Sequence, residues 1–172
     1  MSVYLYLKKV EAGFSSAACL MEAAAAYAGD SGQSMPRELR VARKGKPSFL
    51  NWPGVEFNVS HSGGYWLAAF ARTPLGVDIQ EHRPCDRDRL TARYFHPEER
   101  EWIAGQEDKT AAFFAVWTAK EARGKLSGEG IAVPLARFST VGDPRCRRLE
   151  LAAGYSVCLY TEEEDILLRE LS

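Results

Sequence analysis

The chain has 172 residues, of which 46% are hydrophobic and 26% are charged, and its formal net charge is −1 at pH 7. This length and composition suffice for one well-buried domain or for two small halves that share a core. Because the net charge is close to zero, the overall charge gives no reason to expect nucleic acid or an anionic membrane as partner. The first 14 residues lack the pattern of a signal peptide, and the apolar residues 17–28 are too few to cross a bilayer. We therefore expect a soluble cytoplasmic protein.

The cysteines give no sign of a metal site or a disulfide framework. The chain has four of them, Cys19, Cys85, Cys146 and Cys158, which are far apart in sequence and have no histidine at zinc-binding spacing. We expect reduced thiols that are mostly structural.

The first half is predicted to contain one main helix and several strands. Residues 15–30 favour a helix that begins at Ser15 or Ser16 and can stop at Gly29. Strands are predicted at residues 3–8, 38–43, 55–60, 65–72 and 75–80. Residues 55–60 and 65–72 are typical of a hairpin that turns at Gly63 and Gly64. A break is expected at Gly45 and Pro47.

The second half is predicted to begin with helices and to end with strands. The expected helices cover residues 86–95, 96–105 and 109–127, with Pro97 in a favoured first-turn position. Three or four strands follow, within residues 137–141, 147–152, 155–160 and 166–171. The predicted fold class is α+β, with an amino-terminal half at residues 1–82 and a carboxy-terminal half at 83–172. Each half would pack one main helix on a small antiparallel sheet, with the active site in the crevice between the halves.

The long predicted helix presents a stripe of unusual composition. Phe113, Trp117, Glu121 and Lys125 are four residues apart and share one face. One interpretation is an aromatic core stripe that runs into a solvated ion pair. The other is a binding surface with an acid and a base at its end.

An acidic residue interrupts the apolar strand at residues 75–80. Asp78 and Gln80 lie on one strand face, and burying a carboxylate there is costly unless a cation or hydrogen bonds compensate. Magnesium suits oxygen ligands of this kind. The alternative is that Asp78 faces solvent at a strand end.

Two further segments could bind phosphate. Ser60 and His61 end a strand just before the double glycine, where exposed backbone N–H groups could help. Arg43, Lys44 and Lys46 belong to the densest basic run of the chain. The alternatives are a hairpin-end histidine without a role and a solvated basic loop.

In combination and order, the motifs "GKP", "FNVSHSGG", "GVDI", "RYFHPEE" and "FFAVWTAKEARGKLSGEGIAVPL" point to a known family. Between about residues 45 and 138 the chain resembles the 4'-phosphopantetheinyl transferases of the Sfp type. The resemblance implies an α+β fold with two pseudo-symmetric halves. It also implies a magnesium-dependent transfer of the phosphopantetheine arm of coenzyme A to a serine of an apo acyl or peptidyl carrier protein, which releases adenosine 3',5'-bisphosphate.

The resemblance also implies roles for individual residues. Asp78 and Glu121 would be the carboxylate ligands of Mg²⁺, and Glu121 would also help to deprotonate the acceptor serine. Contacts with the phosphates of coenzyme A would come from Lys46, Ser60, His61 and Lys125. Where the family often has a second acid in the strand, this chain has Gln80, whose amide oxygen can still ligate magnesium without a charge.

The chain is short for the Sfp type, and the predicted helix at residues 15–28 lacks the basic residues usual there. A non-catalytic module that binds coenzyme A or a carrier protein is therefore the alternative function. A metal-dependent phosphohydrolase is a third, but nothing in the sequence indicates an in-line water. Because carrier proteins are generally acidic, Arg87, Arg89, Arg93 and Arg100 are candidate contacts, or simply a solvated helix face. We expect a monomer, with neither nucleic acid nor a membrane as partner.

Overall fold

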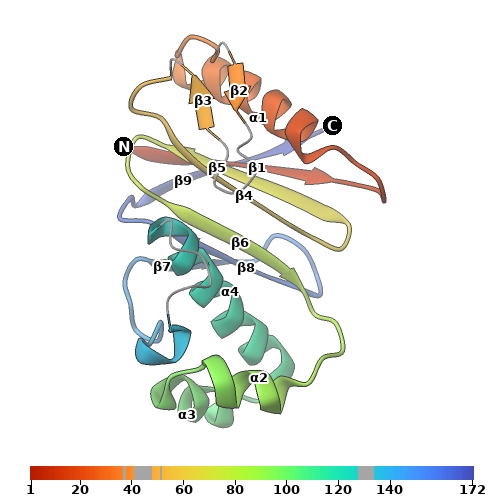
Figure 1. Ribbon diagram of the computed structural model, residues 1–172, viewed down its shortest axis with the longest axis vertical. Coiled ribbons are helices and arrows are strands. Elements are labelled where there is room, and N and C mark those ends of the chain that lie inside the picture. Colours follow the sequence, from red (N-terminus) through yellow and green to blue (C-terminus); the bar gives the residue numbers. More distant parts are fainter. Residues whose placement is uncertain (37, 41–47, 51, 128–133) are drawn as a thin grey trace.

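The structure is a computed structural model that describes every residue except 37, 41–47, 51 and 128–133. Within the described residues, two sheets lie between the helices α1 (Ser16–Ser31) and α4 (Lys109–Ser127) (Figure 1). Helix α1 covers the first sheet, α4 covers the second sheet, and a continuous apolar core joins the two sheets. The mixed α+β class is therefore confirmed, whereas the pseudo-symmetry of the two halves stays a prediction.

The first sheet has the strand order β4-β5-β1-β9. Its strands are β1 (Ser2–Lys9), β4 (Glu56–Ser62), β5 (Tyr65–Ala71) and β9 (Asp165–Leu171). Antiparallel pairing joins β4 to β5, as the predicted hairpin requires, and β5 to β1, but β9 runs parallel to β1. The expectation of an all-antiparallel sheet is wrong at this edge, because the last strand enters beside the first in the same direction.

Alternation along the central strands explains why this sheet is buried on both faces. Successive side chains of a strand point to opposite faces. In β1, Tyr6 belongs to the core beneath α1, while Leu5 and Leu7 belong to the core between the sheets. In β5, Trp66 faces α1 and Leu67 faces the second sheet. The continuous apolar run of β5 therefore serves two cores.

The second sheet is antiparallel and has the order β6-β8-β7. Its strands are β6 (Gly76–Glu81), β7 (Cys146–Leu149) and β8 (Tyr155–Tyr160). Strand β6 comes from residues 1–82 but pairs with β8, while β9 from residues 83–172 lies in the first sheet. The sheets thus do not follow the predicted boundary between residues 82 and 83, and the division into two units stays a prediction.

Side chains, rather than paired backbones, connect the edge strands β4 and β6. The oxygens of Asn58, Ser60 and Ser62 accept hydrogen bonds from the backbone N–H groups of Val77, Ile79 and Glu81 at 3.3, 3.3 and 3.0 Å, respectively. Every second residue of β4 therefore satisfies an N–H group on the free edge of β6. The polar alternation of "NVSHS" has this structural cause, which the sequence analysis missed.

The predicted amino-terminal helix is confirmed, but it ends later than expected. Ser15 caps α1 by accepting a hydrogen bond from the N–H group of Ala18 at 3.2 Å. The helix continues through Gly29 and ends at Gly32, whose φ of 69° is left-handed. Glycine tolerates this conformation at low cost, which explains why Gly32 and not Gly29 is the stop. The short strands β2 (Glu38–Arg40) and β3 (Ser48–Leu50) pair with each other, and β3 was not predicted.

The two polar helical segments become α2 (Arg87–Tyr94) and α3 (Pro97–Gly105), as predicted. His96 and Glu99 form a capping box at the start of α3, and Pro97 occupies its first turn. Phe95 packs with Phe113 and the rest of an aromatic cluster on α4. The amino-terminal part of α4 is thereby fixed against α2 and α3.

Gly76 allows α4 to lie directly on β6. A Cβ atom at this position would lie 1.9 Å from the carbonyl oxygen of Ala122 and 2.8 Å from the backbone nitrogen of Leu126. Both atoms belong to backbone and cannot rotate away, so the close approach requires glycine here. This contact sets α4 against the strand that carries Asp78.

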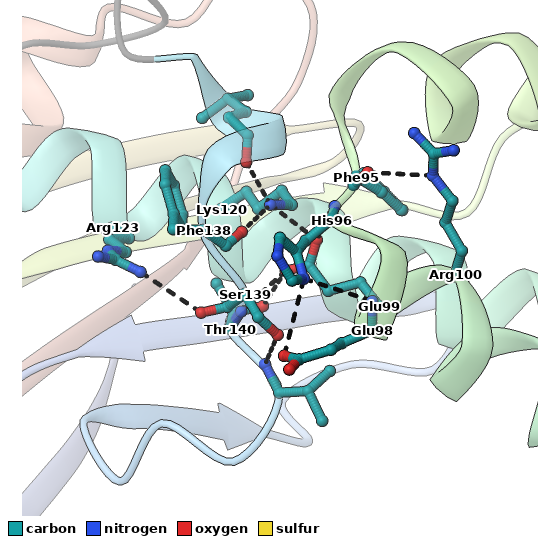
Figure 2. A network of polar contacts seen from close by, with 12 residues as sticks. Phe95, His96, Glu98, Glu99, Arg100, Lys120, Arg123, Phe138, Ser139 and Thr140 are labelled. Carbon is teal, nitrogen blue, oxygen red and sulfur yellow. Dashed lines mark hydrogen bonds and ion pairs between the residues drawn. The ribbon is translucent and has the colours of Figure 1, made fainter.

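A buried ion pair joins α3, α4 and the chain that follows α4 (Figure 2). Lys120 and Glu99 are both fully buried, with 2.7 Å between Nζ and Oε2. Lys120 also donates to the carbonyl oxygens of Leu135 and Phe138 at 2.6 and 2.8 Å. The other oxygen of Glu99 accepts from the N–H and hydroxyl groups of Thr140 at 2.8 and 2.9 Å.

The same network explains a wrong prediction. Residues 137–141 were among the expected strands, but the structure has a 3-10 turn at Leu135–Arg137 and irregular chain after it. Their backbone groups bond to side chains instead of to a neighbouring strand. Lys120 and Arg123 donate to backbone carbonyl oxygens of this segment, and Glu99 accepts from a backbone N–H group. Arg123 lies over the Phe138 ring at 3.8 Å from its centre.

Candidate active site

A cavity of about 660 Å³ opens between β4 and β6 on one side and α2 and α4 on the other. One part of its wall is aromatic and apolar, with Leu90, Phe113 and Trp117. The other part is polar, with Asp78, Glu121 and other ionisable side chains. Concave sites with a few converging polar groups are typical of ligand binding.

The four-residue stripe predicted on α4 faces this cavity. Phe113, Trp117, Glu121 and Lys125 all line it, in one row along the helix. The interpretation as a core stripe ending in a solvated ion pair does not describe Lys125, because its Nζ lies 2.8 Å from Asp78 Oδ1 on another element. The helix therefore brings its charged end to β6.

Asp78 is buried, with 6% of its surface exposed. Its Oδ1 accepts from Ser60 Oγ at 2.7 Å and from Lys125 Nζ at 2.8 Å. The expected compensation for a carboxylate in an apolar strand is thus present, and the alternative of a solvent-facing Asp78 is wrong. Its Oδ2 is buried and has no hydrogen-bond partner among the described residues. A buried carboxylate oxygen without a partner is unusual, because leaving it unsatisfied is costly.

The ammonium group of Lys125 contacts three oxygen atoms in the wall of the cavity, one of which is Asp78 Oδ1. Its Nζ donates to the carbonyl oxygen of Val77 at 3.0 Å and, more weakly, to that of Val59 at 3.4 Å. Together with Asp78 these contacts fix the ammonium group where β4, β6 and α4 meet. The positive charge is therefore placed at the polar side of the cavity.

Glu121 has an unusual electrostatic environment. Burial raises the pKa of its carboxyl group above the ordinary value, and the negative charge of Asp78 raises the pKa further, while Lys125 lowers it. Both carboxyl groups line the same cavity, and their negative charges repel each other there. A cation between such groups would remove the repulsion.

The oxygen donors present fit a magnesium ion. Within the part of the chain that the structure describes, no group of three His, Cys, Asp or Glu side chains could hold a metal. Magnesium, however, commonly takes one or two carboxylates and completes its shell with water and phosphate oxygens. Asp78, whose Oδ2 lacks a partner, Glu121 and the amide of Gln80 all line the same cavity. These three residues would hold the ion.

The residues expected to contact phosphate differ in their surroundings. His61 is exposed at the cavity wall, where its ring packs edge-on against Phe14 with 5.4 Å between ring centres. Ser60 is buried, and its hydroxyl hydrogen is used in the bond to Asp78. A phosphate contact from Ser60 would need that bond to be exchanged. Arg43, Lys44 and Lys46 lie outside the described residues.

Several cavity residues were not found by sequence reasoning. Ser16, Arg83, Cys85 and Phe114 also line the cavity. Arg83 and Cys85 belong to the connection between β6 and α2, which carries no periodic pattern. The only available signal was their position directly after the "GVDIQ" strand, and that signal is weak.

Comparison with known proteins now identifies the family. Residues 74–166 match the family model of the 4'-phosphopantetheinyl transferase superfamily. This segment contains Asp78, Gln80, Glu121 and Lys125, and it covers more than half of the chain. The chain belongs to this superfamily.

Individual members of the superfamily are similar to this chain over part of their length. A 4'-phosphopantetheinyl transferase of Bacillus subtilis is 31% identical over 134 residues, which cover 74% of this chain and 59% of that protein. Psf-1 of Bacillus pumilus is 38% identical over 97 residues, which cover 55% of this chain and 41% of that protein. Sfp of Bacillus subtilis strain 168 is 33% identical over 97 residues, with 55% and 43% covered. The chain thus spans about half the length of the relatives it matches. As for membranes, none of the described helices has the length and hydrophobicity needed to span one.

Proposed function

We propose that the protein is a 4'-phosphopantetheinyl transferase. It moves the phosphopantetheine arm of coenzyme A to the hydroxyl group of a serine on an apo acyl or peptidyl carrier protein, depends on Mg²⁺, and releases adenosine 3',5'-bisphosphate. The observation that carries this proposal is the cavity that Asp78 of β6 and Glu121 of α4 both line, with the ammonium group of Lys125 2.8 Å from Asp78 Oδ1. Membership of the superfamily and the names of the relatives support the same reaction.

In the reaction, the serine oxygen of the carrier protein attacks the phosphorus atom that bears the pantetheine arm. The bond from this phosphorus to the bridging oxygen of the diphosphate breaks, and the leaving group takes the electron pair. Such a transfer depends on positioning and on neutralisation of negative charge more than on covalent help from the enzyme. Bound Mg²⁺ would supply Lewis-acid stabilisation of the phosphate oxygens.

The charged residues of this chain have distinct tasks in this proposal. Asp78, Gln80 and Glu121, which line the cavity, would hold the ion through oxygen atoms. Lys125 lies next to Asp78 and adds a second positive charge toward the diphosphate. His61 is exposed at the cavity wall, so its ring can donate to a phosphate oxygen without first losing a buried bond.

Glu121 is the best placed proton acceptor for the incoming serine. Its carboxylate lines the same cavity as Asp78 and Lys125, which the incoming serine has to enter. The partner supplies the nucleophile, so no serine or cysteine of this chain has to be activated. The proton leaves the serine oxygen for Glu121, directly or through one water.

The apolar wall would accommodate the uncharged part of coenzyme A. Leu90, Phe113, Phe114 and Trp117 line the cavity beside the polar groups. The pantetheine arm has a chain of methylene and amide groups, which can pack on aromatic faces while the diphosphate remains at the charged end.

The proposed carrier-protein contact lies on α2, next to the cavity. Arg87, Arg89 and Arg93 are on this helix, which also contributes Leu90 to the cavity wall. An acidic helical partner docked here would present its serine toward the diphosphate. Charge reversal at Arg89 and Arg93 should therefore raise the KM for the carrier and leave the KM for coenzyme A unchanged. An equal change in both constants would exclude this surface.

The decisive experiment is incubation of the protein with coenzyme A, MgCl₂ and a panel of apo carrier proteins, followed by mass spectrometry of each carrier. A mass gain of one phosphopantetheine, abolished by EDTA, is the expected result. Asp78→Asn should lower kcat/KM by about 10²-fold or more, because a charged ligand at the reacting phosphate is lost. The matched control Asp165→Asn, on the exposed start of β9, should retain full activity.

Binding of coenzyme A without any transfer would instead support the alternative function, a non-catalytic module that binds coenzyme A or a carrier protein. The absence of both coenzyme A binding and transfer would refute the transferase and a module that binds coenzyme A. Calorimetric titration of coenzyme A, with and without Mg²⁺, separates these two outcomes.

A further inference from the structure

Two of the four thiols touch in the folded protein. Cys146 begins β7 and Cys158 lies in β8, and their sulfur atoms are 3.2 Å apart. Both cysteines are reduced. Their contact is in a small core cluster between the second sheet and α4, with Ala119 and Ala122 of the helix packed on it. It therefore lies behind the cavity wall rather than in the cavity.

The strand pairing holds the two thiols on one face of the sheet. Cys146 is opposite Tyr160, and Arg148 is opposite Cys158, so the cysteines are diagonal neighbours on adjacent antiparallel strands. A disulfide bond has a length of about 2.05 Å, so the sulfur atoms need to approach by roughly 1.1 Å. Strand β7 can supply this movement because it is a four-residue strand at the edge of the sheet, where β8 is its one partner among the described strands.

The two thiols differ in access. Cys158 is fully buried, whereas Cys146 is partly exposed at the sheet edge. The hydrogen bond from the Cys158 thiol lowers the pKa of Cys146, and the nearby Arg148 lowers that pKa further. Cys146 is therefore the thiol that a small oxidant from solvent meets first, with Cys158 behind it as the second thiol.

We propose that Cys146 and Cys158 form a reversible oxidation site for oxidants of the peroxide class. The Cys146 thiolate attacks one oxygen of hydrogen peroxide, the O–O bond breaks, and a sulfenic acid and hydroxide form, the latter becoming water when it takes a proton. The sulfur of Cys158 then attacks the Cys146 sulfur and displaces its hydroxyl group, which leaves as water with the Cys158 proton. In total, two thiols and one peroxide give one disulfide and two water molecules.

The bond would join the edge strand to the strand behind the proposed metal ligand. Cys158 lies opposite Asp78 in the pairing of β6 and β8. A closed disulfide therefore fixes β7 to β8, behind the strand that carries Asp78. This site is independent of the transferase proposal, because it requires neither coenzyme A nor a metal and can be tested without either.

The test is treatment of the complete protein with hydrogen peroxide, followed by thiol titration under denaturing conditions and peptide mass mapping. We expect the count of free thiols to fall from four to two, with a dithiothreitol-sensitive link between the peptides of Cys146 and Cys158. The oxidised protein should also unfold at a higher temperature than the reduced protein, because the link constrains the unfolded chain. Cys85→Ser is the matched control, since Cys85 is exposed, and this variant should oxidise in the same way.

The two single variants distinguish the roles of the thiols. Cys158→Ser should leave Cys146 as a sulfenic acid that dimedone labels, whereas Cys146→Ser should give neither the link nor labelling at Cys158. If either serine variant fails to fold, as judged by circular dichroism, the alanine variant replaces it. Three results of the peroxide treatment would overturn the proposal. They are four remaining free thiols, a disulfide link that involves Cys85, and conversion of Cys146 to sulfinic acid without a link.

Discussion

Lys120→Met tests the buried ion pair beside the proposed active site. Methionine keeps much of the length of the side chain but removes the charge. Glu99 would then be left as a carboxylate with 0% exposure, deprived of a cation 2.7 Å away. The carbonyl oxygens of Leu135 and Phe138 would also lose their donor. Of the described residues, Thr140 through its N–H and hydroxyl groups and His96 through its N–H group would still stabilise the charge.

Removing one member of a buried ion pair typically costs about 3–5 kcal/mol. We expect this range here, because both side chains are fully buried and each lost bond involves a charged donor. For a chain of 172 residues, each kcal/mol corresponds to a shift in Tm of roughly 2–4 °C, so Lys120→Met should lower Tm by about 6–20 °C. The exposed Lys9→Met, a change of the same chemistry, should alter stability by no more than about 0.5 kcal/mol.

Urea unfolding of the wild type, Lys120→Met, Glu99→Gln and the double variant measures both the cost and the coupling. Because the double variant buries no net charge, it should be more stable than the sum of the two single losses predicts, by roughly 1–3 kcal/mol. A loss below about 1 kcal/mol for Lys120→Met, or strict additivity in the double variant, would refute the assignment of a charged pair.

Three other predictions concern single positions. Gly76→Ala should destabilise the protein by about 3 kcal/mol or more, since the new Cβ meets the backbone of α4. Gly29→Ala, at a position with open space around it, should instead stabilise α1 by roughly 0.5–1 kcal/mol. If urea unfolding shows similar losses of stability for the two variants, the role assigned to Gly76 is wrong. Burial lowers the pKa of His82, so below about pH 6.5 the unfolded chain binds a proton that the folded chain does not. The free energy of unfolding therefore decreases as the pH is lowered. The fall between pH 7 and 5.5 should be shallower in His82→Gln, and identical slopes would argue against it. Gln80→Glu adds a charged oxygen ligand and should raise activity at limiting Mg²⁺; no change would place Gln80 away from the metal.

Local pattern predicted the elements of the site better than their surroundings. The four-residue spacing of Phe113, Trp117, Glu121 and Lys125 gave the face of α4 that lines the cavity, because helix periodicity fixes which side chains align. The alternation around Asp78 predicted a carboxylate that needs a cation or hydrogen bonds to be buried. In the structure, Ser60 and Lys125 both donate to that carboxylate.

Other features depend on contacts between distant segments, which no local pattern records. The parallel pairing of β9 with β1 is one example, since both strands also fit an antiparallel sheet. The loss of the expected strand at residues 137–141 is another, because side chains from α3 and α4 take its backbone bonds. The three-residue strand β3 is too short to give a periodic signal.

The side-chain contact between the edge strands β4 and β6 affects the width of the cavity. Among the described residues, the side chains of Asn58, Ser60 and Ser62 bridge the two edges by accepting hydrogen bonds from backbone N–H groups of β6, and Ser60 also donates to Asp78. Both strands contribute residues to the cavity wall, including His61 and Asp78. Of the three positions, only Ser62 makes this bridge without also supporting the buried Asp78 carboxylate or already carrying an amide. The separation of the two cavity walls therefore depends on side chains rather than on a backbone ladder, and point substitutions can change side chains.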